Sequence, residues 1–107
     1  MAEIDFKTLK LTWKPNQFLV APEGLCENAQ PHMASKIYDV PIEALREAFL
    51  GVVKRQPRTM VIEKYSQGAR LVQKSRIFRF PDLIDVRYLA VGDDRSTLAV
   101  YSRAKLG

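Results

Sequence analysis

Residues 74–88, Lys-Ser-Arg-Ile-Phe-Arg-Phe-Pro-Asp-Leu-Ile-Asp-Val-Arg-Tyr, decide the fold that we predict for this chain. Apolar and polar residues alternate on both sides of the Pro-Asp pair, which is typical of two strands joined by a tight turn. The stretch also carries more charge than two strands need if they only close a core. We therefore expect it to form the centre of a sheet and to carry a polar surface.

The sequence around this stretch predicts an antiparallel meander. Turn residues separate successive runs rich in β-formers, and short turns between strands imply antiparallel pairing. The predicted strands are Thr59 to Tyr65, Ala69 to Phe80, Leu83 to Val91 and Ser96 to Arg103, and the predicted turns are Ser66-Gln67-Gly68, Pro81-Asp82 and Gly92-Asp93-Asp94.

One helix and two N-terminal strands complete the prediction. Apolar residues recur at helical spacing over residues 41–55, before Pro57. Residues 9–13 alternate as a half-buried strand, residues 17–21 form a second short extended run, and residues 24–39 have the composition of a long loop. The predicted fold class is α+β, in two layers, with one main helix packed on an antiparallel sheet.

Strand alternation divides the side chains between the two faces of this sheet. Asp85 and Arg87 fall on one face of their strand, whereas Arg103 falls on the face opposite Ser102 in the last strand. A bulge near Ser75 would reconcile the two apolar phases of its strand. Both faces carry apolar residues and one helix covers only one of them, so the N-terminal segment, a ligand or a second copy in a homodimer must close the other.

Composition favours a single soluble domain over residues 1–107. The net charge is +5, which permits anionic partners, including a membrane surface, without specifying one. Cys26 is the only cysteine, so an intrachain disulfide is excluded. Neither a signal peptide nor an apolar run of about 18–20 residues is visible, and we expect a cytoplasmic protein without a transmembrane segment.

Three short motifs connect the chain to a known family. Residues 14–22 (KPNQFLVAP), 75–82 (SRIFRFPD) and 101–107 (YSRAKLG) occur in an order and spacing that resemble the domain of unknown function 1499. Its members are small bacterial and plant proteins, some of them tethered to membranes, with no established activity. The resemblance spans nearly the whole chain. It implies kinship with this family, but it does not imply any particular activity.

The chain departs from that family in two places. Family members often carry two cysteines spaced C-x5-C in the loop, where this chain has Cys26 and His32. Any role of a disulfide there does not transfer. The family also continues past the last motif with a polar, basic segment, so we expect either a truncated chain or an omitted disordered tail after Gly107.

The candidate ligand-binding residues are polar or basic and lie on or beside the central strands: Lys74, Ser75, Arg76, Asp85, Arg87, Ser102 and Arg103. Arginine presents a planar fork of donors that fits phosphate or carboxylate, and serine adds a hydroxyl. The alternative is a solvated face with scattered ion pairs of about 0–1 kcal/mol each, in which Asp85 pairs with Arg76 or Arg103.

We predict a small non-enzymatic binding module for an anionic or amphipathic ligand or a partner protein, with no cofactor and no metal. The alternative is an enzyme that uses Asp85 or Cys26 in a pocket closed by the 24–39 loop; Cys26 and His32 alone are too few for a zinc site. A weaker alternative is nucleic-acid binding, with Phe78, Phe80 and Tyr88 stacking on bases.

Overall fold

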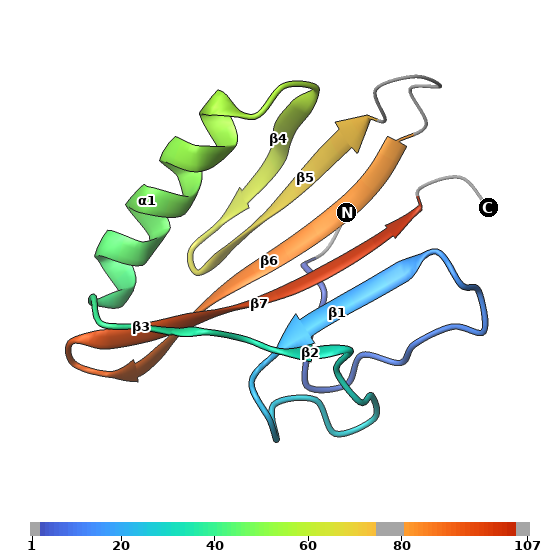
Figure 1. The fold of residues 1–107 in the computed structure, drawn as a ribbon, viewed down its shortest axis with the longest axis horizontal. Helices are drawn as coiled ribbons and strands as arrows, with labels where there is room; N and C mark the ends of the chain where they lie inside the picture. Colours follow the sequence, from blue (N-terminus) through green and yellow to red (C-terminus); the bar gives the residue numbers. More distant parts are fainter. Residues whose placement is uncertain (1–2, 75–80, 105–107) are drawn as a thin grey trace.

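The computed structural model describes residues 3–74 and 81–104. In this part of the chain one helix and seven strands form a two-layer α+β fold (Figure 1). The elements are β1 (Gln17–Ala21), β2 (Met33–Ala34), β3 (Ile37–Tyr38), α1 (Ile42–Arg55), β4 (Thr59–Tyr65), β5 (Gly68–Lys74), β6 (Pro81–Gly92) and β7 (Arg95–Ala104).

The sheet has the order β2-β1-β7-β6-β5-β4, and β3 pairs with the far end of β7. All pairs are antiparallel except β1 with β2, which run parallel. The four C-terminal strands form the predicted meander, and β1 adds to its β7 edge. This arrangement confirms the predicted fold class.

The helix α1 begins and ends where the sequence predicts. Pro41 is the N-cap residue, Glu43 lies in the first turn, and Lys54 and Arg55 lie in the last turn, so the charges complement the helix dipole. Gln56 has extended backbone and ends the helix before Pro57.

We call the sheet surface under α1 the helix face. Its core is formed by Val53 of the helix and by Ala69, Leu71, Val86 and Tyr88 of strands β5 and β6. These residues recur at every second strand position, as alternation requires. A helix of this length is marginal in water by itself, so this contact is what stabilises it.

We call the opposite surface the N-terminal face, because the segment before β1 crosses it. Phe6 packs there against Leu19, Ala21, Ala99 and Tyr101. At its start the same segment places Glu3 within 3.6 Å of Arg87 on β6. The N-terminal segment therefore closes part of the second face, which was one of the three predicted solutions.

The predicted strand over residues 9–13 is wrong. These residues are in no strand; Leu9 and Leu11 pack on the Phe6 cluster, whereas Trp13 is almost fully exposed. An alternating pattern also fits an extended segment that lies across a sheet and packs every second side chain against it. Since β1 occupies the edge of β7, this segment covers the sheet instead of joining it.

Two further local predictions are corrected. Pro81 and Asp82 do not form a turn but begin β6, where Pro81 pairs with Lys74 and Asp82 with Gln73. Proline is tolerated at the first residue of a strand because its missing N–H costs least there. The 24–39 segment is not a plain loop, because β2 and β3 form within it.

The remainder of the predicted second strand, residues 75–80, lies outside the described residues, and so does the predicted bulge near Ser75. Register irregularities in the described ladder fall between Val61 and Glu63 and between Ala90 and Gly92. None of the described helices has the length and apolar character that crossing a membrane requires.

Candidate functional site

A row of facing residues crosses the N-terminal face at the centre of the sheet. Tyr101 on β7 pairs with Leu19 on one side and with Asp85 on the other, and Asp85 pairs with Arg70 on β5. Three polar side chains therefore come together on three adjacent strands. Tyr101 is also a member of the Phe6 cluster.

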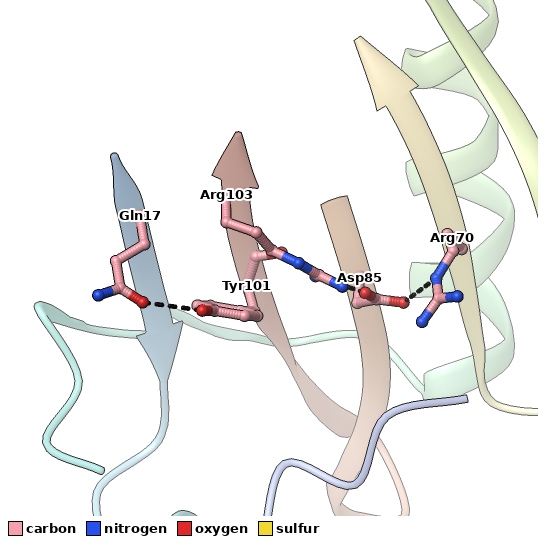
Figure 2. A network of polar contacts seen from close by, with 5 residues as sticks. All are labelled: Gln17, Arg70, Asp85, Tyr101 and Arg103. Atoms are coloured by element: carbon pink, nitrogen blue, oxygen red, sulfur yellow. Dashed lines mark hydrogen bonds and ion pairs between the residues drawn. The ribbon is translucent and has the colours of Figure 1, made fainter. Parts of the chain in front are cut away.

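Asp85 binds two arginines (Figure 2). Its Oδ1 accepts a hydrogen bond from Arg70 Nε at 2.8 Å, and its Oδ2 accepts one from Arg103 Nη1 at 2.5 Å. The side chains of Arg70 and Asp85 are each 3% exposed, but that of Arg103 is 22% exposed. We call Arg70, Asp85 and Arg103 the triad. It consists of a buried inner pair, Arg70 and Asp85, and an outer cation, Arg103, that reaches solvent.

The contact with Asp85 keeps Arg70 in its charged form despite burial. Burial by itself would lower the pKa of Arg70, but the hydrogen bond and the charge of Asp85 outweigh burial and raise the pKa. Two guanidinium groups then face one carboxylate, which leaves the triad with one positive charge. A buried charge needs such partners, because desolvating an unpaired ion is costly.

Further contacts fix the outer arginine and its neighbour. The guanidinium of Arg103 lies 4.8 Å from the ring centre of Tyr101, a cation–π distance, and its Nη1 also reaches the Tyr101 carbonyl at 3.4 Å. The Tyr101 hydroxyl donates to Gln17 Oε1 at 2.8 Å (Figure 2). The polar chain therefore joins strands β1, β7, β6 and β5.

Tyr65 on β4 adds a hydroxyl to this region. Its Oη is buried and has no hydrogen-bond partner among the described residues. Burial raises the pKa of Tyr65; the charge of Arg70 opposes this effect and that of Asp85 adds to it. The hydroxyl is therefore a protonated donor close to the triad.

The structure brings together only some of the predicted site residues. Asp85 pairs with Arg103, one of the two arginines that the alternative interpretation offers as its partner. Arg87 is on the same face but contacts Glu3, whereas Ser102 pairs with Ile84 and lies on the helix face. Lys74 is exposed at the end of β5. Ser75 and Arg76 lie outside the described residues, and so does the alternative pair between Arg76 and Asp85.

Sequence analysis missed Arg70, the most buried cation of the triad. An arginine between Ala69 and Leu71 fits a strand with one solvated face, and nothing local indicates a partner. The signal is non-local, because it depends on the register that places Arg70 opposite Asp85.

A second row on the N-terminal face runs beside the triad. Arg103 pairs with Leu83, Leu83 with Val72, and Val72 with Met60 on the edge strand β4. The outer end of this row lines a pocket of about 390 Å³, whose walls are Arg58, Thr59, Met60, Ile62, Val72 and Lys74. Among the described residues, its lining includes two cations and no acid, its middle is apolar, and Met60 is 66% exposed.

Arg58 has an unusual backbone. Its φ is +57°, a left-handed conformation that costs an L-residue other than glycine about 1–2 kcal/mol. Its carbonyl accepts the Lys74 N–H at 2.9 Å, which ties the two cationic residues of the pocket together through the backbone.

Cys26 and His32 do not form a reactive pair. His32 stacks on Phe18 with ring centres 5.1 Å apart, and its Nδ1 accepts the Leu19 N–H at 2.9 Å. Cys26 packs against the Phe6 cluster, and burial raises the pKa of its thiol. A nucleophilic cysteine needs a lowered pKa, so this environment does not activate it.

Within residues 3–74 and 81–104, no group of three or more His, Cys, Asp or Glu side chains is arranged to hold a metal ion. Comparison of the chain with protein-family models, with curated proteins and with solved structures gives no match.

Proposed function

We propose that this protein is a small binding module that holds an amphipathic anion on its N-terminal face. The observation that carries the proposal is the pocket beside the triad, whose lining combines the apolar side chains of Met60, Ile62 and Val72 with the cations Arg58 and Lys74; Met60 and Ile62 are exposed. Exposed apolar surface bordered by one sign of charge is typical of an interaction site.

The ligand's chemistry follows from that lining. Its apolar body contacts Met60, Ile62 and Val72, and its anionic group pairs with Lys74 and Arg58. A methylene group is worth about 0.8 kcal/mol when it is fully buried. The pocket is open, so each methylene gains part of that value, and affinity rises about twofold to threefold per methylene until the floor is covered.

The triad does not line the pocket, but it adds positive charge to the same face through Arg103. Arg103 Nε and Nη2 have no hydrogen-bond partner among the described residues, and the side chain is held by Asp85 and by the Tyr101 ring. A rigid cation at the inner end of the Met60–Arg103 row adds positive potential to the whole face. Asp85 is then a positioning residue, because it acts through Arg103.

Fatty carboxylates of increasing length test the proposal by isothermal titration calorimetry. Dodecanoate should bind more tightly than octanoate, and acetate and dodecyltrimethylammonium should not bind measurably. Native mass spectrometry of the purified protein gives the bound ligand and the subunit count in the same preparation.

Matched variants locate the site. Lys74→Gln should weaken dodecanoate binding about threefold to tenfold, because an exposed charge pair is worth about 0.2–1 kcal/mol and a charge-assisted hydrogen bond somewhat more. Met60→Gln should weaken it as well. Lys54→Gln is the control for Lys74→Gln, and Val52→Gln, which also replaces an exposed apolar side chain, is the control for Met60→Gln. Both controls lie on α1 and should have no effect. The proposal would be contradicted if the control variants lost as much dodecanoate affinity as the test variants, or if dodecyltrimethylammonium bound tightly.

A further inference from the structure

A second pocket lies on the helix face, between the β4–β5 turn and the middle of α1. Its volume is about 260 Å³, and its walls include Arg46 and Leu50 from the helix, Lys64 and Ser66 from the hairpin, and Tyr88 from β6. One water occupies about 30 Å³ of the liquid, so the space is larger than a single-water site.

Tyr88 forms the inner wall of this pocket. The residue is 2% exposed, and its ring meets Phe49 edge-on with centres 5.9 Å apart. Its hydroxyl is buried and has no hydrogen-bond partner in the part of the chain that the structure describes. Buried hydroxyl groups are almost always hydrogen-bonded in folded proteins, so an unpartnered one indicates a missing acceptor.

Two cations, Arg46 and Lys64, line this pocket. Arg46 is half-buried and Lys64 is exposed, and neither makes an ion pair with any described residue. Among the described residues, the side chain of Arg46 makes one hydrogen bond, a long contact of 3.5 Å from Nη1 to the Ser66 carbonyl. No carboxylate of residues 3–74 or 81–104 lines the pocket, so these residues do not neutralise its charge from within.

We propose that this pocket binds a small phosphate monoester or free phosphate, with the Tyr88 hydroxyl donating to one phosphate oxygen and Arg46 and Lys64 pairing with the others. A phosphate carries a charge of about −1.5 to −2 at neutral pH, which matches two cations better than a single carboxylate does. Its oxygens also supply the acceptor that Tyr88 lacks. Leu50 gives an apolar contact for the organic part of a monoester.

The test is titration of the purified protein with sodium phosphate and with phenyl phosphate, at constant ionic strength, with chemical denaturation as the readout. The unfolding midpoint should rise with ligand concentration and saturate, because a ligand that binds only the folded state stabilises it. Sodium acetate should have no such effect. The dissociation constant should increase at least tenfold in Tyr88→Phe and in Arg46→Gln, and it should be unchanged in Arg55→Gln, which removes an arginine from the last turn of the same helix.

Tyr88→Phe also tests the unpartnered hydroxyl without any ligand. The variant should be at least as stable as the wild type in phosphate-free buffer, since it removes a polar atom that has lost its hydrogen bonds to water. A clear loss of stability would show that the hydroxyl is already bonded, for example to buried water, and would overturn the proposal. The absence of saturable phosphate binding by the wild type, or unchanged binding by Tyr88→Phe, would overturn it too.

The two proposed sites are separable. Arg46→Gln should leave dodecanoate binding intact and Lys74→Gln should leave phosphate binding intact, because the residues lie on opposite faces of the sheet.

Discussion

Replacing Asp85 by asparagine should destabilise the protein more than any single surface change. The substitution keeps the shape of the side chain and one acceptor oxygen, but it leaves two guanidinium groups facing each other across a neutral amide. Arg70 is 3% exposed, so solvent cannot take over its charge. Two unit charges 4 Å apart interact by about 4 kcal/mol at an effective dielectric constant of 20.

The expected loss is about 3–5 kcal/mol, the range for removing one member of a buried ion pair. A domain of this size has a free energy of unfolding of about 5–15 kcal/mol, so the variant retains a folded state near the limit of stability. At about 1.5 kcal/mol per molar urea, the unfolding midpoint falls by about 2–3 M. Far-UV circular dichroism is the suitable probe, because the only tryptophan, Trp13, is almost fully exposed and senses folding weakly.

Two controls separate the triad from general effects of charge. Asp39→Asn also removes a carboxylate beside an arginine, but Asp39 is 92% exposed and lies 3.4 Å from Arg95, so its loss should cost less than about 0.5 kcal/mol. Adding Arg103→Gln to Asp85→Asn should restore part of the lost stability, because it removes one of the two repelling cations. A cost for Asp85→Asn no larger than that for Asp39→Asn would refute the reasoning, and so would simple additivity in the double variant.

Three further outcomes follow from single residues. Arg58→Gly should raise the free energy of unfolding by up to about 1 kcal/mol, since glycine accepts the positive φ, yet weaken dodecanoate binding; a loss of stability in urea would contradict the strain. Because burial raises the pKa of Tyr88 above its ordinary 10.0, the folded state keeps a proton that the unfolded chain releases. The free energy of unfolding should therefore fall as the pH rises above 10. In Tyr88→Phe this fall should be smaller by up to about 1.4 kcal/mol per pH unit, and an equal fall in the two proteins would contradict the raised pKa of Tyr88. Cys26 should react with iodoacetamide more slowly than a free thiol at pH 8, as mass spectrometry would show, because burial also raises its pKa; faster reaction would restore the cysteine as a nucleophile.

The meander could be predicted because its determinants are local. Alternation in the last two strands assigns every side chain to a face, and the turns at residues 66–67 and 93–94 fix the direction of the chain. Alternation alone leaves Arg76 and Arg103 both open as partners of Asp85, and the register between β6 and β7 brings Arg103 to it. The failures occurred where a local pattern fits two environments. Residues 9–13 alternate as a strand does, but they lie across the sheet, and ladder pairing outweighs the turn preference of Pro81-Asp82.

The candidate sites were less predictable because they depend on register and depth. Arg70 and Tyr88 have ordinary neighbours in the sequence, and only the fold shows that one is a buried cation and the other a buried hydroxyl without a described partner. Ser102 illustrates the same limit. It is adjacent to Arg103 in the sequence, but strand alternation places the two side chains on opposite faces of the sheet.

The asymmetry of the triad favours a binding role over a purely structural one. A buried ion pair is often no more stabilising than well-packed apolar residues of the same volume, so stability alone does not account for the triad. Here Asp85 binds two arginines, and the outer one, Arg103, reaches solvent. Asp85 satisfies the inner arginine and at the same time holds the outer one rigidly against Tyr101, on the face that also carries Lys74 and the exposed Met60. Such an arrangement presents a fixed cation beside an apolar floor, which is the chemistry that an amphipathic anion requires.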